Sequence, residues 1–202
     1  MRATARTTIA ATAFIVSVTA GDAVGEPRQV KIGVAVQNLT AVSSETLAEA
    51  RQHVLRIYAA AGIAILWREQ GRNAMPDADL HLTVTVTTGI PAPAAARDAV
   101  LGVAAAAKTR CGRVAYALWD RIAAFARTEG RSEGMILGHV IAHEIGHLLL
   151  PPPSHAVRGI MRERWRPSDL GDAERLALGF TNAQARTMRR RVAAERLLVP
   201  RD

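Results

Sequence analysis

A helix predicted over residues 132–150 constrains the fold more than any other feature of this chain. Apolar side chains cover so wide an arc of this segment that the helix should be largely buried. It ends at three successive prolines, 151–153, because the residue before a proline avoids the α conformation. Three ionisable residues, His143, Glu144 and His147, lie inside this apolar segment. Buried imidazoles need partners, and a metal ion is a suitable one.

The spacing of these three residues predicts a metal site with a general base beside it. Residues four apart lie on one face of an α-helix, so His143 and His147 can bind the same ion. Glu144 lies on the adjacent face, from which it can reach a metal-bound water. Random placement of residues would produce this His-Glu-x-x-His pattern about 0.01 times in such a chain. The alternative is a buried helix that carries two histidines by chance.

A further metal ligand is expected downstream of the helix. His155 follows His147 in the next segment, and Gly159-Ile160-Met161 then forms a short turn. We predict His155 as the third ligand, although a histidine in a surface loop is the alternative. Glu163 and Glu174 are the other residues that could complete the site.

The motif residues resemble those of a known family of enzymes. The resemblance is carried by His143, Glu144, His147, His155 and the turn at residues 159–161. Together they are similar to the site of the zincin metalloproteases, in particular the metzincin type, and to small exported bacterial proteins with the same succession of motifs. The resemblance implies an α+β fold over about residues 29–198, with a twisted, mostly parallel sheet, a backing helix, an active-site helix and a C-terminal helix.

The same resemblance implies a function. It implies one catalytic Zn²⁺ held by His143, His147 and His155, with one coordination position open. Glu144 would assist the attack of a zinc-bound water on a peptide bond, and Met161 would pack beneath the site. We therefore expect an exported zinc metalloendopeptidase acting on a peptide or protein. The alternative is a zinc-binding protein of the same fold with a structural or interaction role and no peptidase activity.

Two positions depart from the metzincin pattern. Metzincins have a glycine three residues after the second histidine and the third ligand six residues after it, where this chain has Leu150 and Pro153. The histidine comes two residues later, at His155. The methionine turn is also closer to the third histidine than in many metzincins.

The chain begins with the pattern of a secretory signal peptide at residues 1–20. Arg2 and Arg6 precede an uncharged, mostly apolar stretch that ends in small residues at Ala20. This stretch is shorter than the roughly 20 residues of a membrane span, although an uncleaved anchor is the alternative. We expect residues 21–202 to form one catalytic domain, secreted or periplasmic, with no membrane insertion after cleavage.

The charge is +8 over 202 residues, and many of the basic residues lie late in the chain. These are Arg186, Arg189, Arg190, Arg191 and Arg196. No aromatic residues interleave with them to stack on bases, so we predict no nucleic-acid partner. A solvated helix face is favoured, and binding to an anionic surface is the alternative. The single cysteine, Cys111, excludes an internal disulfide, and no oligomeric state is predicted.

Periodicity predicts the remaining elements. Strands are expected at residues 30–36, 63–67, 80–87, 100–104 and 113–118, and helices from Ser43 or Ser44 to Gly62, at 121–128, and from Thr181 to about Leu198. The last helix should bury Met188, Val192 and Leu197. His81 should be exposed on its strand, and His139 is expected to be a structural histidine, although it lies one turn before His143.

Overall fold

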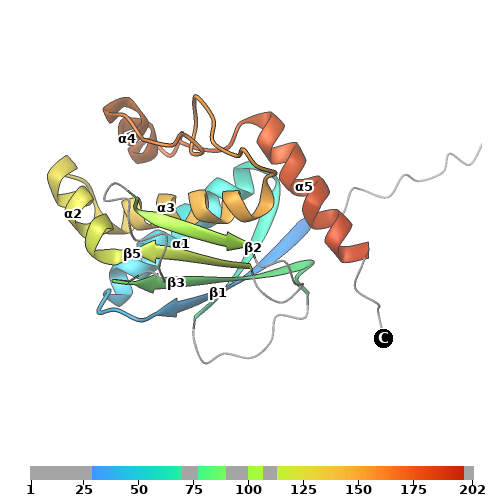
Figure 1. Cartoon of the computed structure of the whole chain (residues 1–202), viewed down its shortest axis with the longest axis horizontal. Helices are drawn as coiled ribbons and strands as arrows, with labels where there is room; N and C mark the ends of the chain where they lie inside the picture. Colours follow the sequence, from blue (N-terminus) through green and yellow to red (C-terminus); the bar gives the residue numbers. More distant parts are fainter. Residues whose placement is uncertain (1–28, 70–76, 90–99, 107–112, 198–202) are drawn as a thin grey trace, which may run out of the picture.

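The computed structural model describes residues 29–69, 77–89, 100–106 and 113–197 (Figure 1). Its elements, in chain order, are β1 (Val30–Asn38), α1 (Ser44–Ala60), β2 (Ile63–Glu69), β3 (Leu80–Thr87), β4 (Gly102–Ala106), β5 (Arg113–Leu118), α2 (Trp119–Glu129), α3 (Glu133–Leu149), α4 (Pro167–Glu174) and α5 (Asn182–Leu197). The α+β class predicted from the sequence is confirmed. The predicted signal peptide and Cys111 lie outside the described residues.

The five strands form one mixed, mostly parallel sheet in the order β2-β1-β3-β5-β4. β1 pairs in parallel with β2 and β3, and β3 pairs in parallel with β5. β4 runs antiparallel to β5 and lies at the edge of the described sheet (Figure 1). The strand at this edge, β4, therefore runs opposite to its neighbour β5. Helix α3 contacts both of these strands.

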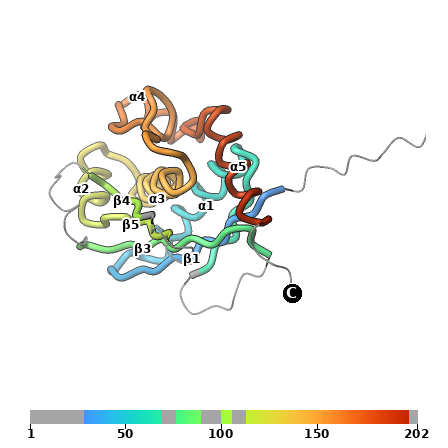
Figure 2. The backbone as a smooth tube through the Cα atoms, turned by 45° about the vertical axis from the view of Figure 1, so that its right-hand side comes forward, coloured from blue at the N-terminus to red at the C-terminus, as the bar shows by residue number. Residues whose placement is uncertain are grey.

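Helices α1 and α3 pack side by side against this sheet (Figure 2). Their close approach depends on Gly138, because a Cβ atom at this position would lie 2.7 Å from the carbonyl oxygen of Ala50. The hydroxyl of Tyr58 on α1 also donates a hydrogen bond to the carbonyl of Ala142, at 3.0 Å. These contacts hold the motif-bearing helix against the rest of the core.

Both helices begin where the sequence predicts. Ser43 caps α1 by accepting a hydrogen bond from the backbone amide of Thr46 at 3.1 Å. Ser132 caps α3 in the same way, accepting from Met135 at 3.3 Å. As expected, most side chains of α3 are buried, so the polar groups on this helix must find partners inside the fold.

Several boundaries differ from the sequence predictions. β4 begins two residues later than expected, within an alanine-rich stretch in which periodicity is weak. α4 was not predicted, because it is short, starts with Pro167 and contains Gly171. Leu197 is 84% exposed, so its assignment to the core is wrong: it lies at the very end of α5, where no neighbouring element covers it. Met188 and Val192 are buried as predicted.

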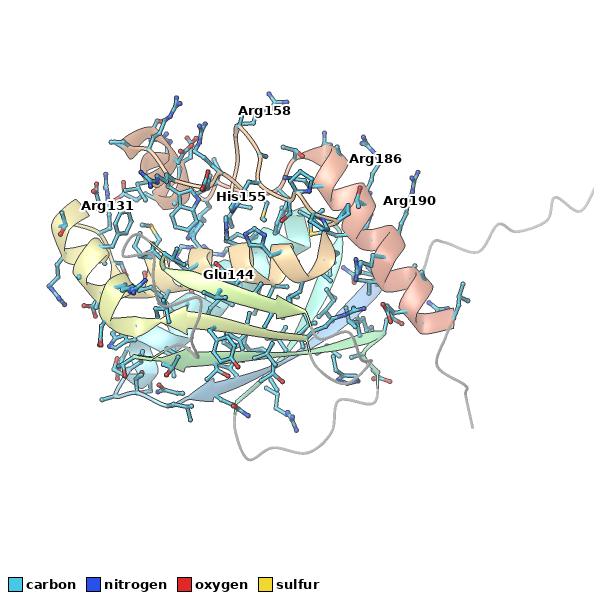
Figure 3. All side chains as sticks on the ribbon, viewed as in Figure 1. Arg131, Glu144, His155, Arg158, Arg186 and Arg190 are labelled. Carbon is cyan, nitrogen blue, oxygen red and sulfur yellow. The ribbon has the colours of Figure 1, made fainter. Side chains whose placement is uncertain are left out.

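The arginines of α5 are not all on a solvated face. Arg189 is half-buried and donates a hydrogen bond to the carbonyl of Ala61 at 2.6 Å, which ties α5 to the end of α1. Arg186 and Arg190 point away from the fold (Figure 3). No helix in the described part of the chain has the length and hydropathy of a membrane-crossing segment.

Candidate metal centre

Three histidines meet at the surface of α3. His143 and His147 lie one turn apart on this helix, and their Nε2 atoms are 2.9 Å apart. His155 comes from the segment after α3 (Figure 3). One ring nitrogen of each histidine can serve as a ligand, and these three nitrogens lie within 4.8 Å of one another. This group could hold a metal ion.

The other ring nitrogens of the two helical histidines are held by the protein. His143 Nδ1 donates to the carbonyl oxygen of Ile160 at 2.7 Å, which leaves the lone pair on Nε2. His147 Nδ1 forms a hydrogen bond of 2.6 Å with Ser154 Oγ. Metal-ligating histidines ordinarily use the second ring nitrogen in this way, which sets both tautomer and ring orientation.

The chemistry of this donor set fits a divalent transition metal such as zinc. Two nitrogens bound to zinc at about 2.05 Å with tetrahedral angles lie about 3.3 Å apart, close to the observed separation of His143 and His147. Burial lowers the pKa of His143 and of His147 to about 4, so both imidazoles are neutral at physiological pH. Neutral imidazole is the form that binds metal.

The turn after His155 packs against the motif helix. Met161 is fully buried, and a Cβ atom at Gly146 would lie only 2.6 Å from its Sδ atom. A hydrogen bond of 2.8 Å from the amide of Ala156 to the carbonyl of Met161 closes the turn. Gly159, at a φ of 76°, adopts the left-handed conformation that glycine tolerates best. Met161 thus packs against the motif helix at Gly146, the residue before His147.

Trp165 forms one wall of the site. Its Nε1 donates to the same Ile160 carbonyl that accepts from His143, at 3.0 Å. Its ring meets the ring of His143 edge-on, with centroids 6.1 Å apart. The aromatic ring therefore restricts the motion of one of the three histidines.

Glu144 lies beside the histidines and close to the edge strand. Its side chain is buried, and burial raises the pKa of its carboxyl group to about 8. A Cβ atom at Gly102, the first residue of β4, would lie 2.7 Å from Glu144 Oε1. Sequence analysis did not identify Gly102, although a glycine at a strand can signal the close approach of another group.

The alternative ligands lie elsewhere. Glu174 forms an ion pair with Arg131, and Glu163 is exposed. His139 is buried, and its Nδ1 forms a hydrogen bond of 2.8 Å with the carbonyl of Met135. In the described part of the chain, the three-histidine group is the one cluster whose ligand atoms could meet on a single ion.

The structure shows where three other residues singled out by their position or type lie. Arg162 forms an ion pair of 2.9 Å with Asp169. Arg158 is exposed and points away from the histidines (Figure 3). His81 is exposed on β3, as its strand periodicity predicted.

Comparison with known proteins does not extend these observations. No protein-family model matches the sequence, and no curated protein is significantly similar to it. The arrangement of the three histidines is therefore the feature on which a functional assignment depends.

Proposed function

We propose that this chain is a zinc-dependent metallopeptidase of zincin type, with residues 21–202 as its catalytic domain. The observation that carries the proposal is the convergence of His143, His147 and His155 next to the buried carboxyl group of Glu144. A site that only stabilises the fold has no use for a general base at this position. The metzincin type is supported by Met161, which is fully buried and packs against Gly146 of the motif helix.

In this proposal the three histidines hold one Zn²⁺ ion. Zinc, when bound, supplies a Lewis acid that polarises a carbonyl group and lowers the pKa of water toward about 7. The hydrogen bonds from His143 to Ile160 and from His147 to Ser154 keep the two rings directed at the ion.

Glu144 is the proposed general base. It takes a proton from the attacking water and passes it to the leaving amine as the peptide bond breaks. Its pKa of about 8 reflects burial, and a nearby dication favours the charged carboxylate that this role requires. The close packing of Gly102 limits where the carboxylate can move.

The edge strand β4 suggests how a substrate is held. It lies at the border of the described sheet, and Gly102 brings its backbone next to Glu144. An extended peptide could add to this edge as a further strand, so that main-chain hydrogen bonds align its scissile bond with the site. A peptide or protein is accordingly the proposed partner, and the predicted signal peptide supports a secreted or periplasmic location.

A digestion experiment tests the proposal. The zinc-loaded protein is incubated with a diverse peptide mixture, and the products are identified by mass spectrometry. We expect cleavage by the unaltered protein, and a loss of about 1,000-fold or more in rate for Glu144→Gln. Glu129→Gln is the matched control, because this glutamate is exposed at the end of α2 and should leave the rate unchanged.

Zinc stoichiometry separates the possible outcomes. Stoichiometric zinc without cleavage by any variant would contradict the peptidase proposal and favour the structural or interaction role. Equal cleavage by the unaltered protein and Glu144→Gln would show that Glu144 is not the base.

A further inference from the structure

A cavity lies on the α1 side of α3, and none of the three histidines lines it. It has a volume of about 190 Å³ and is enclosed by α1, α3 and the segment between α4 and α5. Its lining residues are His53, Arg56, Ile57, Ala60, Ala61, His139, Leu176, Ala177, Leu178, Gly179 and Phe180. Figure 2 shows α1, α3 and α5 close together around this region. A cavity of about 150 Å³ can hold benzene, so this one has room for a small ring or a branched chain together with a polar group.

The polar groups of the cavity are gathered on one side of α1. His53 and Arg56 are three residues apart and therefore lie on the same face of the helix. His53 Nδ1 is buried and has no hydrogen-bond partner among the described residues. The other ring nitrogen of His53 lies 3.9 Å from Glu49, whose carboxylate accepts a hydrogen bond from Ser132. His53 Nδ1 has almost no accessible surface, so a ligand in the cavity would contact other atoms of the His53 ring.

The charges of the lining residues indicate which kind of ligand the cavity favours. Arg56 is exposed at the mouth of the cavity, and no acidic residue is among the lining residues. Ile57, Leu178 and Phe180 supply an apolar interior. The guanidinium of Arg56 is suited to the two oxygens of a carboxylate, while the interior is suited to a hydrocarbon body.

We propose that this cavity binds a small monocarboxylate with an apolar body, whose carboxylate contacts Arg56 at the mouth of the cavity. This site is separate from the metal centre, and the inference does not depend on peptidase activity. Phe180 connects the two sites, because a Cβ atom at Gly146 of the motif would lie 2.9 Å from Phe180 Cε1. A ligand in the cavity therefore contacts a side chain that also packs on the metal-binding helix.

Direct titration tests the ligand class. Benzoate, hexanoate and 3-methylbutanoate are titrated into the zinc-loaded full chain, and binding is followed by calorimetry and ligand-observed NMR. Their neutral counterparts, benzyl alcohol, 1-hexanol and 3-methylbutanol, are titrated in parallel. We expect saturable binding of at least one carboxylate, about fivefold or more tighter than the matching alcohol. Absence of saturable carboxylate binding, or equal affinity for acid and alcohol, would overturn the proposal.

Two pairs of variants locate the bound carboxylate. Ala60→Leu narrows the cavity, whereas Ala59→Leu places the same side chain on an exposed residue of α1 that does not line it. Arg56→Gln removes the charge at the mouth, and Arg51→Gln removes an exposed arginine of α1 that does not line the cavity. We expect weaker carboxylate binding in the first member of each pair only, by about fivefold or more for Arg56→Gln.

The same variants exclude binding at the metal centre. A carboxylate bound to zinc would be unaffected by Ala60→Leu and Arg56→Gln, and that result would overturn the proposal. Because Arg56 is exposed, its substitution should leave the fold intact, which keeps the test informative if Ala60→Leu is unstable.

Discussion

At the scale of single residues, each histidine of the site is positioned in a different way. His143 is held by the carbonyl of Ile160, which also accepts from Trp165, and His147 is held by the hydroxyl of Ser154. His155 belongs to the same cluster but is exposed. The two partly buried histidines are therefore oriented by the fold, whereas His155 adds the third nitrogen from a loop.

Replacing His155 tests whether it is the third ligand. We expect His155→Ala to reduce zinc affinity by about 100-fold or more, because one of three protein ligands is lost. Zinc affinity is measured by competition with a chelator, and His81→Ala serves as control because His81 is exposed on β3. Unchanged affinity would contradict the assignment and direct attention to Glu163.

Ser154 should contribute through His147 and not through direct coordination. We expect Ser154→Ala to lower zinc affinity by roughly 10-fold, since loss of the hydrogen bond to His147 Nδ1 frees the orientation of the ring. The same chelator competition measures the effect, with Ser168→Ala as a control at an exposed serine of α4. A change as large as that of His155→Ala would mean that Ser154 has a more direct role.

At the scale of the elements, the site depends on close approaches between backbones. Gly138 allows α3 to pack against α1, and Gly102 allows β4 to lie against Glu144. The prolines after α3 end the helix, and the following segment returns His155 to His143 and His147. The third nitrogen therefore depends on how the loop and the helix pack together.

Adding one methyl group at the edge strand should impair the general base. We expect Gly102→Ala to reduce the rate of peptide cleavage by about 10- to 100-fold, because the new Cβ atom would lie 2.6 Å from Glu144 Cγ and displace it. Zinc affinity should change little, since the three atoms nearest to the added Cβ all belong to Glu144. Gly89→Ala is the control, with no atom within 4 Å of the added Cβ. An unchanged rate would show that Glu144 tolerates displacement.

At the scale of the whole molecule, burial of histidines couples stability to pH. His139 is 1% exposed, and burial lowers its pKa to about 4, although the hydrogen bond to Met135 partly opposes this effect. In the unfolded chain the same imidazole would titrate near pH 6.5. Between these values the unfolded chain binds more protons, so stability should fall as the pH decreases from about 6.5 through 4.

Substitution of His139 isolates this contribution. We expect His139→Gln to flatten the pH dependence of unfolding free energy between pH 6.5 and 4, by an amount on the order of 3 kcal/mol over the range. Urea unfolding at successive pH values, with chelator present to remove metal, provides the measurement. His81→Gln should retain the dependence of the unaltered chain because His81 is exposed. If the unfolding free energy of His139→Gln fell with pH as steeply as that of the unaltered chain, His139 would not be the source of this dependence.

Much of this arrangement follows from local sequence. The caps at Ser43 and Ser132 and the alternation in β3 were predicted because each depends on neighbouring residues and regular periodicity. The pairing of His143 with His147 on one helix face follows from the helical repeat alone. The amino-acid sequence by itself therefore determined the motif helix, the α+β class and the histidines of the candidate metal site.

Only the tertiary structure decided the remaining features. The position of His155, the closeness of Gly102 to Glu144 and the exposure of Leu197 depend on contacts between segments far apart in the chain. The strand order with antiparallel β4 at one edge likewise arises from packing across the sheet. Such contacts leave no periodic signal in the sequence, because their energy comes from groups that meet only after the chain has folded.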